Sequence, residues 1–418
     1  MSQLDTIDYP KKHQGYQYLI VLLMFIVGLL NANPYFIYMG LDILNQIIIA
    51  LFYILLSLLV GITILNHLYK KKKYLFSMFP YWLVLTLAVL IKIFILFIQF
   101  PHLFLPGNSY FSLVVEYTSR FLLIFILVTN IHSQSYVRKT IWAFGLGISI
   151  SVILPFIFYP EMIGTRTAFI EDYYFNGAFW NSSVVAFMTV GWLLVALSNI
   201  ETLKHKKSIL LGLFILFIFG SFAGLSRAAA VSLILSLIVY LIASNQFSRY
   251  LRGIIITILI SLSVVFFFGD YVDSFMQRFD QGITFENESR TTIWREYIKN
   301  IPDYLLFGEI EGDYKKYSYT GHGPHSVFLN WLVQFGIFAL IGFVVMIAGV
   351  LFSIKNISKY ESRLVSAGLY AWLIAYLSIA MINETGFNEL QLFASFGIIL
   401  AWGNQVKKDK KIFINNID

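Results

Sequence analysis

Two residues that border apolar runs have side chains suited to chemistry at a membrane surface. Arg227 lies in a very short turn, residues 224–228, between two strongly apolar runs. An ionisable residue so close to lipid costs on the order of 3 kcal/mol without a partner, which makes it a functional candidate by default. His325 follows the segment Gly321-His322-Gly323-Pro324. A histidine can take a proton from a hydroxyl group at neutral pH, so His325 is a candidate general base.

Each candidate also has a structural interpretation that the sequence leaves open. The Arg227 side chain would reach lipid headgroups if it extended outward. His325 would meet solvent at the start of a helix that Pro324 begins. His322 and His325 could bind a metal together, but their spacing is nonspecific and no clear carboxylate ligand accompanies them. We therefore predict no metal and no cofactor.

The composition indicates what kind of protein must position these residues. Of 418 residues, 58% are hydrophobic and 13% are charged, whereas soluble domains carry about 25% charged residues. So little polar surface cannot cover a globule in water, and so high an apolar content excludes a disordered chain. The chain has no cysteine, which excludes a disulfide scaffold, a thiolate zinc site and a cysteine nucleophile. The sequence therefore predicts an integral membrane protein.

Twelve apolar runs are long enough to cross a bilayer, which needs roughly 20 helical residues per span. They predict an all-α, polytopic protein of about 12 transmembrane helices that forms a single membrane domain over residues 1–418. The runs are residues 16–32, 47–65, 79–98, 111–131, 141–159, 179–197, 209–224, 228–243, 253–269, 326–352, 364–382 and 387–402.

Lys and Arg are concentrated in alternate connections between these runs, which is typical of cytoplasmic loops. The pattern predicts a multi-pass protein with both termini in the cytoplasm. It also accounts for the net charge of +7, so no nucleic-acid partner is predicted. The first run lacks a convincing cleavage site and is interpreted as a retained span. The basic connections are residues 11–12, 70–73, 138–139, 204–207, 249–252, 355–363 and 407–411.

The connection over residues 270–323 is too long to be a simple link and is predicted to be a functional loop on the outer face. It is rich in aromatic and acidic residues. Aromatic rings beside carboxylates suit sugars, and the same mixture suits a loop that packs its own small core. Within it, Ser289 is a possible N-cap for a helix that Pro302 ends.

A few charged residues lie inside the predicted spans or in a short outer turn. Glu116 and Arg120 are four residues apart on one helical face, and Lys92 lies in the preceding span. We expect the three to neutralise one another as a structural cluster, and a proton relay is the alternative. Glu384, in the outer turn 383–386, could approach the same face as Arg227.

Several of these residues together resemble a known family. Ser226-Arg227 precedes a span, and the outer loop carries Arg290-x-x-x-Trp294, Pro302 and Gly308. The chain then reaches Gly321-His322-Gly323-Pro324-His325-Ser326-x-x-Leu329, with Gly336 inside the next predicted helix. This order is similar to that of the bacterial O-antigen polymerase and O-antigen ligase superfamily, over roughly residues 208–342. Relatives often have Asn at the position of Ser326 and a small residue such as Gly at the position of Ala228.

The resemblance implies a fold similar to lipid-dependent GT-C type glycosyltransferases. It also implies transfer of glycan from undecaprenyl diphosphate, without a metal and with inversion at the anomeric carbon. Arginine binds phosphate with two parallel N–H groups, so Arg227 and Arg290 are assigned to the diphosphate, with Arg295 as a weaker candidate. His325 would orient or deprotonate the acceptor hydroxyl. Trp294, His322 and Glu384 are possible contacts to the acceptor or sugar.

The predicted function is a polysaccharide polymerase that joins lipid-linked repeat units of an O-antigen, capsule or exopolysaccharide. A ligase that transfers glycan to a lipid A core or to protein, and a polysaccharide-lipid flippase or transporter, are the alternatives. The predicted partners are the undecaprenyl-diphosphate-linked donor and acceptor, the lipid bilayer, and a chain-length regulator and flippase of the same pathway. The predicted location is the bacterial plasma membrane, with the active site on the extracytoplasmic side.

Overall fold

Long apolar helices make up most of the structure, a computed structural model. It describes residues 14–32, 36–37, 39–70, 79–104, 109–160, 167–170, 173–176, 178–223, 226–245, 289–309, 314–319, 321, 323–383, 387 and 389–415. The longer helices up to the middle of the chain are α1 (Gln14–Leu29), α3 (Asp42–Lys70), α4 (Phe79–Gln99), α5 (Ser109–Asn130), α6 (Gln134–Phe158), α7 (Ala178–Ala186), α8 (Trp192–Ser198), α9 (Lys204–Ala223) and α10 (Arg227–Ser244).

The remaining elements include the outer-loop helices and the last three long helices. They are α13 (Ser289–Lys299), α14 (Ile301–Tyr304), the 3-10 turn η8 (Tyr314–Tyr317), α15 (Val327–Phe335), α16 (Ile337–Ile357), α17 (Arg363–Ile382) and α18 (Leu390–Asn415). Two short 3-10 turns, η3 (Leu30–Ala32) and η5 (Pro101–Phe104), follow α1 and α4.

The helices confirm the predicted all-α, polytopic membrane fold. Within the described residues, eight helices are long and apolar enough to cross a membrane, and two shorter apolar helices cover Tyr16–Ala32 and Ser182–Ser198. These ten segments overlap ten of the twelve predicted runs. The predicted run 387–402 overlaps α18, and the run 253–269 lies outside the described residues.

The predicted span 326–352 is wrong in one respect, because Gly336 divides it into α15 and α16. Gly336 has φ +82°, a left-handed conformation that favours glycine. A Cβ atom there would lie 2.2 Å from the carbonyl oxygen of Leu306. Hydropathy stays high across Gly336, so the apolar pattern alone could not reveal the break.

One small β-hairpin departs from the all-helical prediction. Strands β1 (Thr167–Ile170) and β2 (Tyr173–Asn176) pair antiparallel, with Thr167 opposite Asn176 and Ile170 opposite Tyr173. The hairpin lies in the connection between α6 and α7.

A π-helical turn, η7 (Phe187–Gly191), lies between α7 and α8 and is completely buried. The Thr189 carbonyl in this turn accepts a hydrogen bond from Trp372 Nε1 of α17 at 3.0 Å. Ser232 of α10 donates to the carbonyl of Ala375, also in α17, at 2.8 Å. Both η7 and α10 are therefore fixed to α17, which positions the start of α10 at Arg227.

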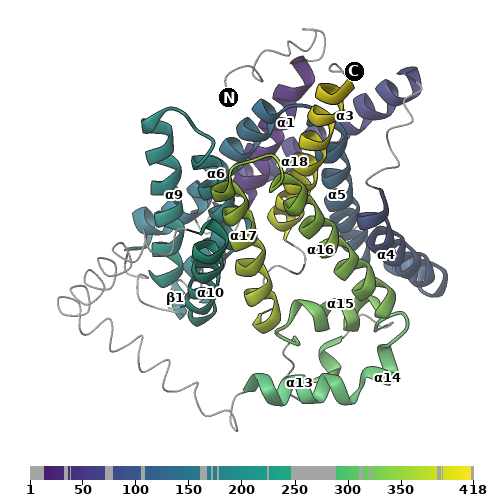
Figure 1. Cartoon of the computed structure of the whole chain (residues 1–418). Helices are drawn as coiled ribbons and strands as arrows, with labels where there is room; N and C mark the ends of the chain where they lie inside the picture. Colours follow the sequence, from purple (N-terminus) through teal and green to yellow (C-terminus); the bar gives the residue numbers. More distant parts are fainter. Residues whose placement is uncertain are drawn as a thin grey trace.

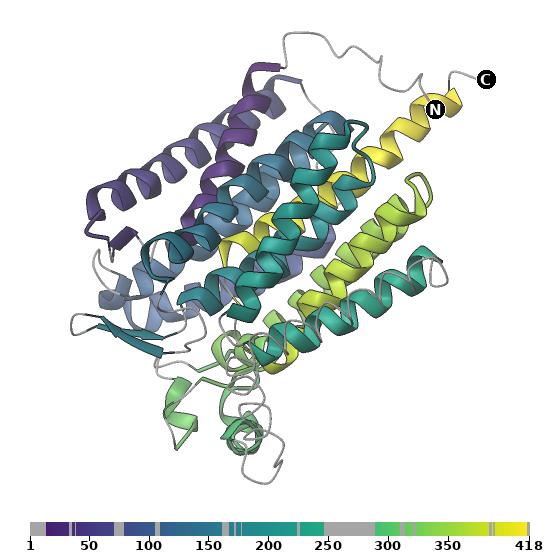
Figure 2. The same cartoon turned by 90° about the vertical axis from the view of Figure 1, so that its left-hand side faces the viewer.

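The outer-loop helices gather at one end of the helix bundle. In two views at right angles, the start of α1 and the end of α18 lie at the same end of the bundle, and α13, α14 and α15 lie at the opposite end (Figures 1 and 2). One continuous cluster of buried hydrophobic residues extends from α1 to α18. A second, smaller cluster joins the outer loop to α15, and it contains Ile293, Tyr297, Tyr304, Leu332 and Val333.

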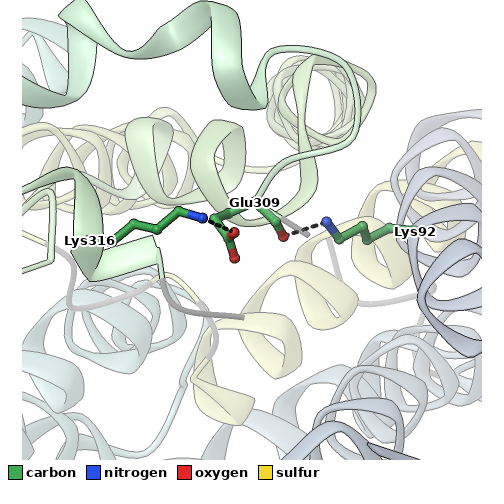
Figure 3. Close-up of polar contacts among 3 residues, drawn as sticks. All are labelled: Lys92, Glu309 and Lys316. Carbon is green, nitrogen blue, oxygen red and sulfur yellow. Dashed lines mark hydrogen bonds and ion pairs between the residues drawn. The ribbon is translucent and has the colours of Figure 1, made fainter. Parts of the chain in front are cut away.

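The expected cluster of intramembrane charges is confirmed for two residues and wrong for the third. Arg120 and Glu116 form an ion pair at 3.3 Å on α5. Lys92 of α4 instead donates a 2.6 Å hydrogen bond to the backbone carbonyl of Glu309, a residue of the outer loop (Figure 3). The sequence could not predict this contact because its partner is a main-chain atom 217 residues away.

Candidate functional site

Arg227 is the first residue of α10. The preceding residue, Ser226, is buried and caps the helix, since its Oγ accepts a hydrogen bond from the backbone N–H of Ala229 at 3.2 Å. The Ser-Arg pair therefore has a local explanation: the serine begins the helix and the arginine follows at its electropositive end. A half-buried guanidinium at a helix N-terminus is a favourable environment for an anion.

Arg290 and Trp294 lie four residues apart on α13, so they share one face of that helix. Both side chains are half-buried. The Trp294 indole Nε1 donates a 2.7 Å hydrogen bond to the carbonyl of Pro324. This contact attaches the face of α13 that carries Arg290 to the turn immediately before His325.

Arg295 lies on a different face of α13. It is exposed and lies five positions after Arg290, which corresponds to about 140° of rotation around the helix axis. The helix therefore directs the two arginines differently, and Arg290 is the better placed of the two toward the Pro324 turn.

His325 has a backbone conformation that non-glycine residues rarely adopt. Its φ is +47°, in the left-handed region, which costs an L-residue about 1–2 kcal/mol. The turn is held on both sides: the Pro324 carbonyl accepts from Trp294, and Ser326 begins α15, where its carbonyl accepts from the Asn330 N–H at 2.9 Å. Strain that the surrounding structure maintains in this way is typical of functional sites.

The far end of α15 is fixed by a close crossing of two backbone segments. Gly308 and Gly336 both have positive φ, +74° and +82°. A Cβ at Gly308 would lie 2.4 Å from the backbone of Gln334. Across this crossing, the Glu309 N–H donates to Val333 O and the Ile337 N–H donates to Leu305 O, each at 2.7 Å. The two glycines of the sequence pattern thus belong to one structural feature.

Several aromatic residues of the outer loop form its small core. The Tyr304 hydroxyl donates to the carbonyl of Tyr297 at 2.5 Å, and the Tyr304 and Tyr317 rings lie 5.0 Å apart. Burial raises the pKa of the Tyr304 phenol, so it remains a donor at neutral pH. The packing interpretation of the loop therefore holds for these three tyrosines.

Tyr319 differs from Tyr297, Tyr304 and Tyr317 because it is 99% exposed. Its backbone N–H donates to the Glu296 carboxylate of α13 at 3.1 Å. An exposed ring on a fixed backbone remains available for stacking with a sugar.

The structure therefore brings some of the predicted site residues together. The Trp294–Pro324 hydrogen bond brings α13, the helix that carries Arg290, next to the residue that precedes His325. Helix α10 begins at the end of the bundle where α13 and α15 lie (Figures 1 and 2), and Arg227 is its first residue. Among the predicted contacts, His322 and Glu384 lie outside the described residues. Within those residues, no group of three or more His, Asp or Glu side chains is placed to hold a metal.

Two carboxylates of this region were not singled out from the sequence. Glu296 holds the backbone of Tyr319, and Glu309 connects the outer loop to α4 and α15. Neither stands out among the acidic residues of a long loop, because main-chain atoms take part in these contacts: the Tyr319 N–H for Glu296, and the N–H and carbonyl of Glu309 itself.

Comparison with protein families places this region in a known group. Residues 212–344 match the family model described as O-antigen ligase. The matched segment contains Arg227, α13, the Gly308–Gly336 crossing and His325. A comparison with curated proteins found no match. Over the segment that carries the candidate site, the chain is therefore similar to the O-antigen ligase family.

Proposed function

We propose that the protein is a polysaccharide polymerase of the extracytoplasmic membrane face. It would transfer glycan from an undecaprenyl-diphosphate-linked donor to a sugar hydroxyl of a lipid-linked repeat unit of O-antigen, capsule or exopolysaccharide. The main support is the 2.7 Å bond from Trp294 to Pro324, which joins the Arg290 face of α13 to the strained turn at His325. A cation and a candidate base are thereby attached to one local structure.

The proposed reaction separates the roles of these residues. The acceptor hydroxyl attacks the anomeric carbon, the bond from that carbon to the diphosphate oxygen breaks, and His325 receives the hydroxyl proton. Negative charge accumulates on the leaving diphosphate, where the guanidinium groups of Arg227 and Arg290 would stabilise it. Attack opposite the leaving group inverts the anomeric configuration. Because arginine supplies the positive charge, the proposal invokes no metal.

A ligase is the second candidate, and the matched family description, O-antigen ligase, favours it. A ligase would use the same donor and the same three residues, with a lipid A core or a protein as acceptor. Our preference for a polymerase depends on the sequence, because this chain carries only the sparse core of the motif and polymerases vary widely.

A flippase or transporter is less well supported by the contacts inside the bundle. Such a protein would use intramembrane charges as a relay or an ion site. Here Arg120 pairs with Glu116 on the same helix, and Lys92 bonds a backbone carbonyl. Both contacts bind the charged groups to other protein groups, as expected for residues with a structural role.

We further propose cytoplasmic termini and an extracytoplasmic site in the plasma membrane of a bacterium. The positions of α1, α18 and the outer-loop helices at opposite ends of the bundle support this topology (Figures 1 and 2). The proposed substrates are two undecaprenyl-diphosphate-linked oligosaccharides in the bilayer. A chain-length regulator and a flippase of the same pathway are the proposed protein partners.

The experiment compares wild type with Arg227→Ala, Arg290→Ala and His325→Ala in a strain that lacks its own copy. Lys299→Ala is the matched control, because Lys299 is an exposed basic residue at the other end of α13. After membrane abundance is equalised, surface glycan is separated on a gel. A polymerase predicts that the ladder collapses to one repeat unit in the three variants, while the control keeps the ladder.

Other outcomes identify the alternatives. Loss of core-attached glycan with persistent lipid-linked polymer would identify a ligase. Donor that accumulates on the inner leaflet would identify a flippase. Wild-type ladders from all three abundant variants would show that the assigned residues do not carry the reaction.

A further inference from the structure

Glu309 makes hydrogen bonds to α15, α4 and η8 and so connects the outer loop to the membrane helices. Its backbone N–H donates to Val333 O of α15 at 2.7 Å. Its backbone carbonyl accepts from Lys92 Nζ of α4 at 2.6 Å. Its carboxylate accepts from Lys316 Nζ of η8 at 2.8 Å. Figure 3 shows Glu309 between the two lysines, which approach from opposite sides.

The lysine in the membrane has no carboxylate within ion-pair distance among the described residues, so its bond to the loop is unusual. Lys92 is 2% exposed in the middle of an apolar helix. A buried ammonium is costly unless polar groups surround it. Here a main-chain carbonyl provides the hydrogen bond, and the Glu309 carboxylate attracts the ammonium electrostatically. The loop can provide a hydrogen-bond acceptor for the Lys92 ammonium only while Glu309 stays in this position.

Glu309 also lies beside the backbone crossing that holds one end of α15. It follows Gly308, and the Gly308–Gly336 crossing holds the C-terminal end of α15. The N-terminal end of α15 follows His325 and is held through the Trp294–Pro324 bond. The segment 289–309 therefore bonds to the turn before α15 and to the C-terminal end of α15, and Lys92 attaches that segment to α4.

We propose that Lys92 and Glu309 are positioning residues, which fix the outer loop on α4 and thereby set where the Pro324–His325 turn lies relative to the membrane helices. The expected effect on reaction rate rests on the proposed glycosyl transfer. The expected effect on the position of the loop relative to α4 does not depend on that function. Neither residue needs to touch substrate, since Glu309 is 6% exposed and the bonds described above are directed to protein atoms.

A distance measurement between α4 and α13 tests the positioning directly. The natural chain has no cysteine, so spin labels can be attached only at Ile98→Cys on α4 and Ile298→Cys on α13. Both isoleucines are exposed, at 63% and 56%. In the full-length protein in nanodiscs, we expect a narrow distribution of distances between the labels for the wild-type background. Lys92→Met and Glu309→Ala should broaden it.

The kinetic measurement separates positioning from binding and from general damage. With an undecaprenyl-diphosphate-linked oligosaccharide as substrate, kcat of both variants should fall about tenfold or more, because a displacement of about 1 Å can cost that much. KM for the donor should change by less than about twofold, since the diphosphate contacts are retained. Glu309→Gln keeps a hydrogen-bond acceptor for Lys316 and should recover part of the lost rate.

Matched variants control for the substitutions themselves. Ile91→Met changes the neighbouring, lipid-facing residue of α4, and Lys315→Met removes the lysine beside Lys316. Asp303→Asn removes an exposed carboxylate from α14. All three should keep the wild-type distances and rate. If Lys92→Met fails to accumulate, Lys316→Met removes the exposed side of the same connection and should still broaden the distances.

The outcomes that overturn the proposal differ from those that overturn the function. Unchanged distances in Lys92→Met and Glu309→Ala would show that these residues do not hold the loop. A lower kcat with unchanged distances would assign them to the chemistry instead. A wild-type protein without glycosyl transfer would refute the proposed function, and the distances would still decide the positioning.

Discussion

The Trp294 indole N–H and the Pro324 carbonyl, 2.7 Å apart, join the first helix of the outer loop to the residue that precedes His325. The contact links two segments of the sequence pattern that are 30 residues apart. It also gives the tryptophan a role that differs from sugar stacking, because its polar edge is engaged with the backbone of the candidate site.

Replacing Trp294 with Phe should separate the hydrogen bond from the ring. The buried Pro324 carbonyl would lose its donor, which costs about 1–3 kcal/mol. We expect a lower melting temperature and a kcat reduced about tenfold or more as the turn at His325 relaxes. Thermal unfolding in detergent and single-turnover kinetics measure the two effects. A variant with wild-type kcat would show that this bond does not position the base.

His325→Gly should stabilise the protein while it removes activity. Glycine adopts the left-handed conformation at φ +47° without the cost of about 1–2 kcal/mol that an L-residue bears. His325→Ala removes the imidazole and keeps the strain, so it serves as the matched comparison. We expect the Gly variant to melt at a higher temperature than the Ala variant, with neither supporting transfer. Equal melting temperatures would argue that the turn is not strained.

Gly336→Ala should reduce folding severely. The added Cβ would lie 2.2 Å from the Leu306 carbonyl oxygen, in a conformation that already disfavours alanine. Gly212→Ala is the control, because a Cβ at this position of α9 meets no atom within 4 Å. We expect little membrane-inserted protein from the first variant and wild-type abundance from the second. Abundant, stable Gly336→Ala protein would contradict the close crossing.

The two kinds of loop tyrosine should respond differently to truncation. Tyr297→Ala opens a cavity in the small core and should cost roughly 3 kcal/mol of stability, as large-to-small core substitutions do. Tyr319→Ala removes an exposed ring and should leave stability unchanged. If Tyr319 stacks on the glycan, its variant will have a raised KM for the oligosaccharide substrate. An unchanged KM would leave the ring without a role in binding.

Glu361, between α16 and α17, should make stability depend on pH. Burial raises the pKa of its carboxyl group, while hydrogen bonds and the Arg138 charge lower it by less. A carboxyl whose pKa is raised in the folded state stabilises the fold when protonated, and this contribution is lost as pH rises through that raised pKa. Glu361→Gln should therefore raise the melting temperature at neutral pH and change it little at acidic pH. Glu201→Gln is a comparison at the same end of the bundle. If the difference in melting temperature between wild type and Glu361→Gln did not change with pH, the raised pKa of Glu361 would be contradicted.

Hydropathy was sufficient to predict the membrane fold. Apolar runs identified the helices because bilayer thickness sets their length, and the match over residues 212–344 confirms the segment that the motif indicated. The same hydropathy concealed the break at Gly336, where a backbone crossing rather than a polar residue ends the helix.

The site could be predicted only as far as side-chain types allow. Arg227, Arg290 and His325 stand out because charged and titratable groups are rare beside apolar runs. The contacts that position them involve the carbonyls of Pro324 and Glu309, and every residue has such a carbonyl. The left-handed backbone of His325 also has no signal in the sequence, since glycine is the residue that normally marks it.

The crossing of Gly308 and Gly336 limits how this protein can be recombined with its relatives. Because the segment 289–309 bonds to both ends of α15, a chimera that exchanges only the loop would join two surfaces that were not selected together. A functional exchange should transfer residues 289–337 as one module. Within this module, new glycan preferences would arise most easily from substitutions of Tyr319, because its exposed side chain does not take part in the packing that holds the module together.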